Sequence, residues 1–274
     1  MSRPIPDENA IGRPHTNRSA LGLRIKNEAA KVYASTGALY EVASASDSVF
    51  GSPLGPIEGP NERIFLPQFV YFGPHSSVDP VRIAVFGGLS GEDFKGSWAL
   101  IDWVKALLVR PDIGQGVSVS VFPVVNLNAI RGCTESARLQ DIDWFGSRVP
   151  EIRLITQNAK IRSYQGFIRI ESSRDSVSGV VVRTAVKRRA HRSSAEVFAS
   201  SDFEPWDTRF ETLGPESELS GPLSLSRVLG SALFEVVLSV PESWTQSTWN
   251  SNLLPLLGRL VASYRKFFSY GGEL

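Results

Sequence analysis

The amino-acid sequence predicts an α/β sandwich with a mostly parallel sheet, and two observations support this. Apolar, strand-like runs alternate with amphipathic helical stretches from residue 63 onward, which is typical of strands joined by crossover helices. The chain has 274 residues, an ordinary length for one α/β domain. A chain of that size buries about three quarters of the surface that it exposes when unfolded. The sequence shows no internal repeats.

The first 62 residues have a more mixed pattern than the rest of the chain. Residues 21–34 predict a short helix, and residues 51–61 are dense in glycine and proline, which predicts a loop. We therefore expect an N-terminal arm over residues 1–62, packed on a single α/β domain that covers residues 63–274.

Strand signals recur through that domain. Residues 64–71 are apolar but contain Pro67, which favours an edge strand because proline cannot donate to a sheet ladder. The β-branched run at 81–86 stops at Gly87. Further strands are predicted at 117–122, 167–170, 179–182 and 233–240.

Helix signals fall between these strands. Residues 95–109 place Trp98 and Ile101 on one apolar side. Residues 150–163 begin with a proline at the first helical position. A long amphipathic helix is predicted within 244–268, with Pro255 as a kink or a boundary. The stretch 200–226 is rich in Ser, Glu, Pro and Gly, which predicts a long loop.

The composition excludes several classes of protein. The 29 Lys and Arg balance 28 Asp and Glu, and a net charge of +1 argues against a nucleic-acid binder. The single cysteine, Cys133, excludes a disulfide framework and a cysteine-rich zinc module. No apolar stretch approaches the roughly eighteen residues of a spanning helix, and the first residues do not resemble a signal peptide. We expect a cytoplasmic protein with neither a membrane nor a nucleic-acid partner.

Seven segments occur in an order that resembles one known family. They are 82–93 (RIAVFGGLSGED), 123–128 (PVVNLN), 141–145 (DIDWF), 150–155 (PEIRLI), 166–175 (GFIRIESSRD), 234–241 (FEVVLSVP) and 262–267 (ASYRKF). Together they resemble the zinc carboxypeptidase superfamily, in its succinylglutamate desuccinylase/aspartoacylase-like branch. The resemblance implies a three-layer sandwich of the zinc-exopeptidase (phosphorylase/hydrolase-like) type. In such sheets the site lies beyond the carboxyl ends of the strands.

The resemblance also shows where the ligands of the family's zinc ion would stand. The family holds zinc with His-x-x-Glu and a distant His, and the metal activates a water molecule for hydrolysis. Those positions are Ser90, Asp93 and Glu171 in this chain. Serine is a poor zinc ligand, whereas carboxylates suit Mg²⁺, Ca²⁺ or Mn²⁺ better than Zn²⁺. The three histidines, at positions 15, 75 and 191, fall at no ligand position, so we expect no bound metal and no cofactor.

The substrate-binding positions of the family are also altered. Its Asn-Arg pair, which binds the substrate's carboxylate, reads Asp143–Trp144 here, so an anion replaces a cation. A carboxylate substrate would therefore be repelled. The position of its oxyanion-stabilising Arg reads Thr134, although Arg131 or Arg138 is close enough to compensate.

Glu235 stands at the position of the family's general base. Because the zinc-ligand positions and the Asn-Arg pair are both altered, the sequence predicts a pseudoenzyme with a binding or regulatory role. Its partner would be an active paralogue, or a small molecule that binds in the old pocket. The alternative is an active metallohydrolase, a peptidase or an N-acyl amino acid amidohydrolase. Its zinc or other metal would be held in a site rebuilt from Asp93, Glu171 and Glu235.

Two other features have both a structural and a functional interpretation. Residues 183–192 (RTAVKRRAHR) form a basic segment, which could bind phosphate or an acidic partner, or could begin a solvated helix. Trp144, with Trp206 and Trp244, could line a cleft or pack in the core. The sequence around Ser90 lacks the second glycine of a nucleophile elbow, which argues against a serine hydrolase.

Overall fold

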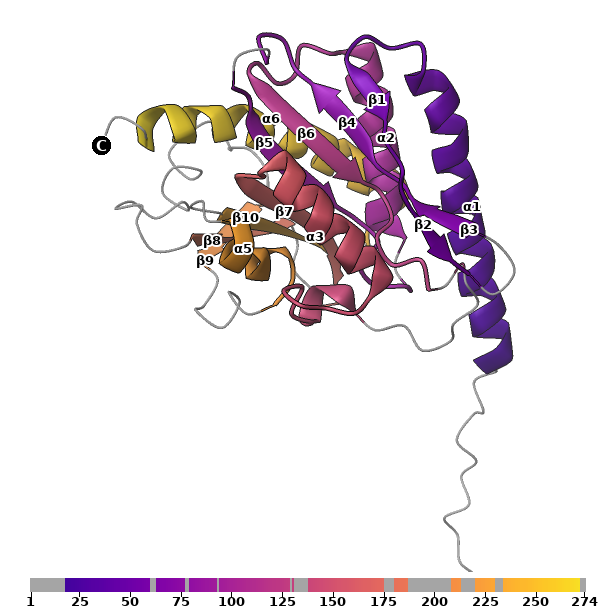
Figure 1. The fold of residues 1–274 in the computed structure, drawn as a ribbon. Coiled ribbons are helices and arrows are strands. Elements are labelled where there is room, and N and C mark those ends of the chain that lie inside the picture. Colours follow the sequence, from indigo (N-terminus) through magenta and orange to yellow (C-terminus); the bar gives the residue numbers. More distant parts are fainter. Residues whose placement is uncertain are drawn as a thin grey trace, which may run out of the picture.

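The computed structural model describes residues 18–59, 63–76, 79–92, 94–128, 130, 138–174, 180–186, 208–212, 220–229 and 234–271. A twisted eight-stranded sheet crosses the molecule in the order β1-β4-β6-β5-β7-β10-β8-β9 (Figure 1). Its strands are β1 (Val49–Gly51), β4 (Phe69–Phe72), β5 (Val81–Phe86), β6 (Val117–Phe122), β7 (Gly166–Ser173), β8 (Val180–Val186), β9 (Thr208–Thr212) and β10 (Phe234–Pro241).

The centre of the sheet is parallel. β6, β5, β7 and β10 run in the same direction, and β8 pairs with β9 in parallel. The antiparallel pairs are β1–β4, β4–β6 and β8–β10. The predicted α/β sandwich with a mostly parallel, mixed sheet is therefore confirmed. Burial on both faces explains the apolar runs of the central strands.

Pro67 divides what the sequence predicted as one edge strand. β3 (Arg63–Leu66) pairs with β2 (Leu54–Glu58) in a separate two-stranded sheet, whereas β4 lies inside the main sheet between β1 and β6. Proline has no N–H for a ladder, so the chain changes sheet at this residue. The edge is formed by β1, which comes from the region predicted as an N-terminal arm. The boundary of that arm at residue 62 remains a prediction.

Helices cover both faces of the sheet. α3 (Pro150–Arg162) lies on one face with the short elements η1 (Leu139–Asp141), η3 (Pro222–Leu225) and α5 (Ser226–Leu229). α2 (Lys95–Val109) and α6 (Gln246–Gly271) cover the other face, and α1 (Arg18–Ala43) packs along α2 (Figure 1). Within the described residues no helix is long and apolar enough to cross a membrane.

Several predicted bounds need correction. The predicted short helix at 21–34 is the much longer α1, and Pro255 lies inside α6 without ending it. The region predicted as a loop at 200–226 contains β9 and η3. The basic segment at 183–192 begins inside β8, not at the start of a helix, and its residues after 186 lie outside the described part.

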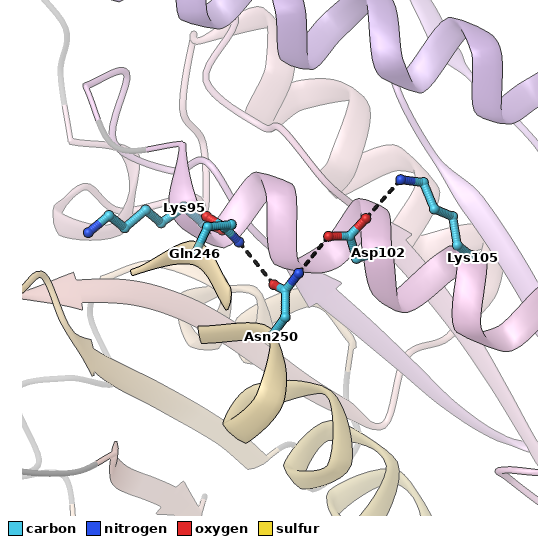
Figure 2. A network of polar contacts seen from close by, with 5 residues as sticks. All are labelled: Lys95, Asp102, Lys105, Gln246 and Asn250. Carbon is cyan, nitrogen blue, oxygen red and sulfur yellow. Dashed lines mark hydrogen bonds and ion pairs between the residues drawn. The ribbon is translucent and has the colours of Figure 1, made fainter. Parts of the chain in front are cut away.

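A polar network fixes the beginning of α6 against α2 (Figure 2). The Asn250 side chain donates to Asp102 at 2.6 Å, and Gln246 donates both to Asn250 and to the backbone carbonyl of Lys95. The Lys95 ammonium donates to the carbonyls of Glu242 and Trp244, in the turn that joins β10 to α6. These contacts position the last strand of the sheet relative to the helices behind it.

Candidate functional site

Four polar side chains gather on β7 and β10, in the middle of the parallel sheet. The register pairs Glu235 with Phe167 and Ser239 with Glu171. Because side chains alternate along a strand, Arg169 and Glu171 share one face of the sheet with Glu235 and Ser239. We call Arg169, Glu171, Glu235 and Ser239 the charged cluster.

Arg169 is the centre of the charged cluster. Its Nε atom lies 2.9 Å from Glu235 Oε1, and its Nη1 atom lies 3.7 Å from Glu171 Oε2. Ser239 donates a hydrogen bond of 2.8 Å to Glu171 Oε1. The exposed fractions of the side chains are 11% for Arg169, 19% for Glu171 and 1% for Glu235. One guanidinium therefore faces two carboxylates where little water can reach.

The pairing within the charged cluster is incomplete. Although Arg169 Nε and Glu235 Oε1 are close, their orientation is not that of a hydrogen bond. Among the described residues neither carboxylate oxygen of Glu235 has a hydrogen-bond partner. Burial raises the pKa of Glu235 to about 7; the positive charge of Arg169 lowers it and the negative charge of Glu171 raises it. Near neutral pH Glu235 is therefore partly protonated, which reduces the negative charge of the cluster.

A turn covers the charged cluster from the α3 side. Gly221 has φ +60°, and a Cβ atom at this position would lie 3.9 Å from both Arg169 Nη1 and Glu235 Oε1. The same atom would be 3.2 Å from the carbonyl oxygen of Gln140. Only glycine adopts this conformation without strain at such a close approach. The Gly221 N–H donates to Ile142, which joins the turn to the loop after η1.

Trp144 belongs to the core, and its role as a substrate-pocket residue stays a prediction. Its side chain is fully buried, and its ring meets Phe86 edge to face at 5.2 Å. The indole N–H donates to the carbonyl of Leu139 at 2.7 Å. The ring is therefore shielded from any ligand that binds at the surface of this loop. Trp244 is only partly buried against the core, and Trp206 lies outside the described residues.

Asp143 has a cationic partner that the sequence did not reveal. Its carboxylate lies 2.6 Å from Arg227 Nη1, and the Arg227 guanidinium sits 5.5 Å from the centre of the Phe145 ring. Burial acts to raise the pKa of Asp143, but hydrogen bonds from Arg227, the Phe145 N–H and Ser224 outweigh it and lower the pKa below its ordinary value. The anion predicted to repel a carboxylate is thus locally neutralised.

The remaining predicted site residues are dispersed or lie outside the described part. Ser90 is half-buried after β5, and its hydroxyl accepts from the Glu92 N–H at 3.5 Å. Arg138 is exposed and pairs with Asp141 at 3.3 Å, so a role at an oxyanion stays a prediction. His75 is exposed in a turn. Asp93, Arg131, Thr134, His15 and His191 lie outside the described residues.

The described donor set does not fit a zinc ion. Glu171, at one predicted ligand position, accepts from Ser239 and faces a guanidinium, and a cation at 3.7 Å opposes the approach of a second cation. Among the described residues, which leave out Asp93, no three His, Cys, Asp or Glu side chains are grouped to hold a metal. Zinc prefers nitrogen and sulfur ligands, and the charged cluster offers only carboxylate and hydroxyl oxygens.

Arg169 and Ser239, which complete the charged cluster, were not among the predicted site residues. A usable signal for Arg169 was present, because it is a lone charge inside a run that reads as a buried strand. In such a strand a charge needs a partner. Ser239 and Arg227 carried no comparable signal, since each acquires its role only when distant segments pair.

The fold is similar to those of solved carboxypeptidases. A metallo-carboxypeptidase from Burkholderia cenocepacia matches with a TM-score of 0.63 and 12% identity, over 84% of this chain and 68% of that one. A metallo-carboxypeptidase from Pseudomonas aeruginosa, in complex with (2-guanidinoethylmercapto)succinic acid, matches with a TM-score of 0.56 and 13% identity, over 83% and 68%. Bovine thrombin-activatable fibrinolysis inhibitor, in complex with tick carboxypeptidase inhibitor, gives 0.58 and 11%, over 89% and 97%.

Sequence comparison adds no closer assignment. No protein-family model matches the sequence, and a search among curated proteins finds no significant relative. At these identities the structural matches establish a carboxypeptidase-like fold and leave the chemistry open. The predicted likeness to zinc carboxypeptidases is confirmed at the level of the fold, and the succinylglutamate desuccinylase/aspartoacylase-like branch remains a prediction.

Proposed function

We propose that this chain is a pseudoenzyme, a carboxypeptidase-like protein without zinc hydrolase activity. Its ancestry would lie in the succinylglutamate desuccinylase/aspartoacylase-like branch. The observation that carries the proposal is the state of Glu171, which stands where the family has a zinc-binding histidine. Ser239 hydrogen-bonds this carboxylate and Arg169 faces it, so its negative charge is already compensated within the protein.

The loop that contains Asp143–Trp144, at the family's substrate-binding positions, supports the same proposal. Arg227 could have supplied the cation that the Asp143–Trp144 pair lost, but it is engaged by Asp143 at 2.6 Å. Trp144 is buried beneath the loop. A binding or regulatory role, with an active paralogue or a small molecule as partner and in the cytoplasm, is part of this proposal.

Metal content and hydrolysis test the proposal directly. The full-length chain, freed of any histidine tag, would be analysed for zinc by mass spectrometry and assayed with N-acyl amino acids and C-terminally blocked and free peptides. An active metallo-carboxypeptidase prepared in parallel serves as the positive control. We expect less than a tenth of a zinc equivalent, as an order of magnitude, and no turnover above the buffer rate. Stoichiometric zinc together with hydrolysis would disprove the proposal.

A second candidate is an active metallohydrolase with a rebuilt, oxygen-rich site. The observation in its favour is that Glu171 and Glu235 both face the same guanidinium and so approach one another. Asp93 would complete the set, and Glu235 would act as the base. In that case Mn²⁺ or Zn²⁺ would raise the Tm of the wild-type chain through mass action, and Glu171→Gln would abolish the increase.

A further inference from the structure

The charged cluster contains a cation that belongs to the protein. Arg169 lies between the carboxylates of Glu171 and Glu235, with nitrogen–oxygen distances of 3.7 and 2.9 Å. Glu235 is almost completely buried, and neither of its oxygens has a hydrogen-bond partner among the described residues. A buried carboxyl group without hydrogen bonds is tolerated where it keeps a proton or where a nearby positive charge offsets the loss of water.

We propose that Arg169 is a built-in substitute for a divalent cation at this point of the carboxypeptidase-like fold. Its guanidinium occupies the space between the two carboxylates and prevents a metal ion from binding there. The inference rests on the proposed function, since a protein that uses zinc would not need an internal cation among these residues. It goes further by naming the residue that replaces the metal.

The surroundings define what would bind if the guanidinium were removed. The donors left behind are the carboxylates of Glu171 and Glu235, and the Gln140 carbonyl oxygen lies near the same turn at Gly221. An all-oxygen set of this kind suits Mn²⁺ or Ca²⁺ better than Zn²⁺. Glutamine is shorter than arginine, so Arg169→Gln would leave both the space and the negative charge for such an ion.

Thermal unfolding of the full, tag-free chain tests this at pH 8, with EDTA, MnCl₂ or CaCl₂. We expect neither ion to change the Tm of the wild-type chain. Arg169→Gln in EDTA should unfold roughly 10 °C lower, because the buried carboxylate of Glu235 loses its ion-pair partner. Saturating Mn²⁺ or Ca²⁺ should restore roughly 5 °C of that loss. The matched control is Arg82→Gln on β5, whose guanidinium is one-third exposed and pairs with Asp79 at 3.6 Å; it should show no response to either ion.

A second variant keeps the test decisive if Arg169→Gln folds poorly. Arg169→Gln/Glu235→Gln removes one charge of each sign and should fold without responding to either ion. If the double variant folds while Arg169→Gln stays unfolded with Mn²⁺, or if the folded single variant ignores both ions, the inference is wrong. If the double variant also fails to fold, Arg169 acts through packing and not through charge, which overturns the inference as well. Zinc in the wild-type chain would instead contradict the proposed function, so the two failures are distinguishable.

Discussion

Two polar clusters lie on the same face of the sheet. One joins neutral side chains by hydrogen bonds, and the other joins charged side chains by ion pairs. The neutral cluster consists of Gln68, Asn158 and Tyr164, and the Tyr164 ring packs edge to face on Phe167. The charged cluster begins with Arg169, the next residue after Phe167 on this face of β7. Gln68, Tyr164 and Glu235 are almost completely buried, so these members of the two clusters differ mainly in charge.

The neutral cluster is satisfied by hydrogen bonds. Gln68 donates to Asn158 at 3.2 Å, and the Tyr164 hydroxyl donates to the same acceptor at 2.5 Å. In the charged cluster, by contrast, Glu235 has an ion pair but no hydrogen bond among the described residues. Neutral networks of this kind favour one unique packing of the core. A buried ion pair contributes little to stability, even though breaking it is costly. The comparison suggests that the charged cluster is retained for a reason other than stability.

The largest predicted effect is a loss of stability as the pH rises, and it comes from the charged cluster alone. The folded chain holds a proton on Glu235 up to about pH 7, whereas the ordinary pKa is 4.5. Between these values the folded state binds more protons than the unfolded state, so the free energy of unfolding falls with rising pH. The total loss is about 3 kcal/mol, because each pH unit is worth about 1.4 kcal/mol.

Urea unfolding from pH 4.5 to pH 8 measures this slope. Glu235→Gln mimics the protonated acid, so the difference between the wild-type chain and this variant should appear between pH 4.5 and 7. A wild-type slope equal to that of the variant would mean that Glu235 titrates normally, and the contrast between the two clusters would disappear.

The turn over the charged cluster should give the next largest effect. Gly221→Ala places a methyl group in a left-handed conformation, 3.2 Å from the Gln140 carbonyl oxygen. Conformational strain and crowding together should cost about 2 kcal/mol. Gly146→Ala is the matched control, because Gly146 has φ +76° with no atom within 4 Å of the added Cβ, so only strain remains, about 1 kcal/mol. Equal losses in urea unfolding would show that the Gln140 carbonyl moves aside and that crowding adds nothing to the strain.

Removing the hydroxyl group of the neutral cluster should cost less. Tyr164→Phe deprives Asn158 of a donor and should destabilise the fold by about 1.5 kcal/mol. This loss should be the same at pH 5 and pH 8, since burial raises the pKa of Tyr164 well above its ordinary value. Tyr33→Phe removes a comparable hydroxyl that bonds Phe65 at an exposed site, and should cost about 0.5 kcal/mol. A pH-dependent loss in Tyr164→Phe would indicate that the two clusters are coupled.

The sequence predicted the elements of the fold better than the partners within the site. The helix predicted at 95–109 has the bounds of α2, and the strands at 81–86 and 117–122 match β5 and β6, because Gly and Pro mark their ends locally. β1 and β9 were missed, since such short strands exist only through their neighbours. Asp143 and Arg227 are 84 residues apart, and no local pattern predicts that they meet.

The smallest effect comes from an exposed ion pair, and it completes the comparison. Lys105 pairs with Asp102 at 2.8 Å on the surface of α2, at one end of the network of Figure 2, with side chains 58% and 31% exposed. Lys105→Gln should cost about 0.4 kcal/mol at low ionic strength, because water and the mobility of both side chains offset most of the attraction. Urea unfolding with and without 1 M NaCl is the measurement.

Salt should affect this ion pair and the charged cluster differently. In 1 M NaCl the Debye length is about 3 Å, so the loss from Lys105→Gln should vanish. The pH-dependent difference between the wild-type chain and Glu235→Gln should persist, because Glu235 is almost completely buried and salt screens mainly exposed charges. If salt erased both effects, the charged cluster would be open to solvent. Arg169 could then not keep metal ions away from the carboxylates of Glu171 and Glu235.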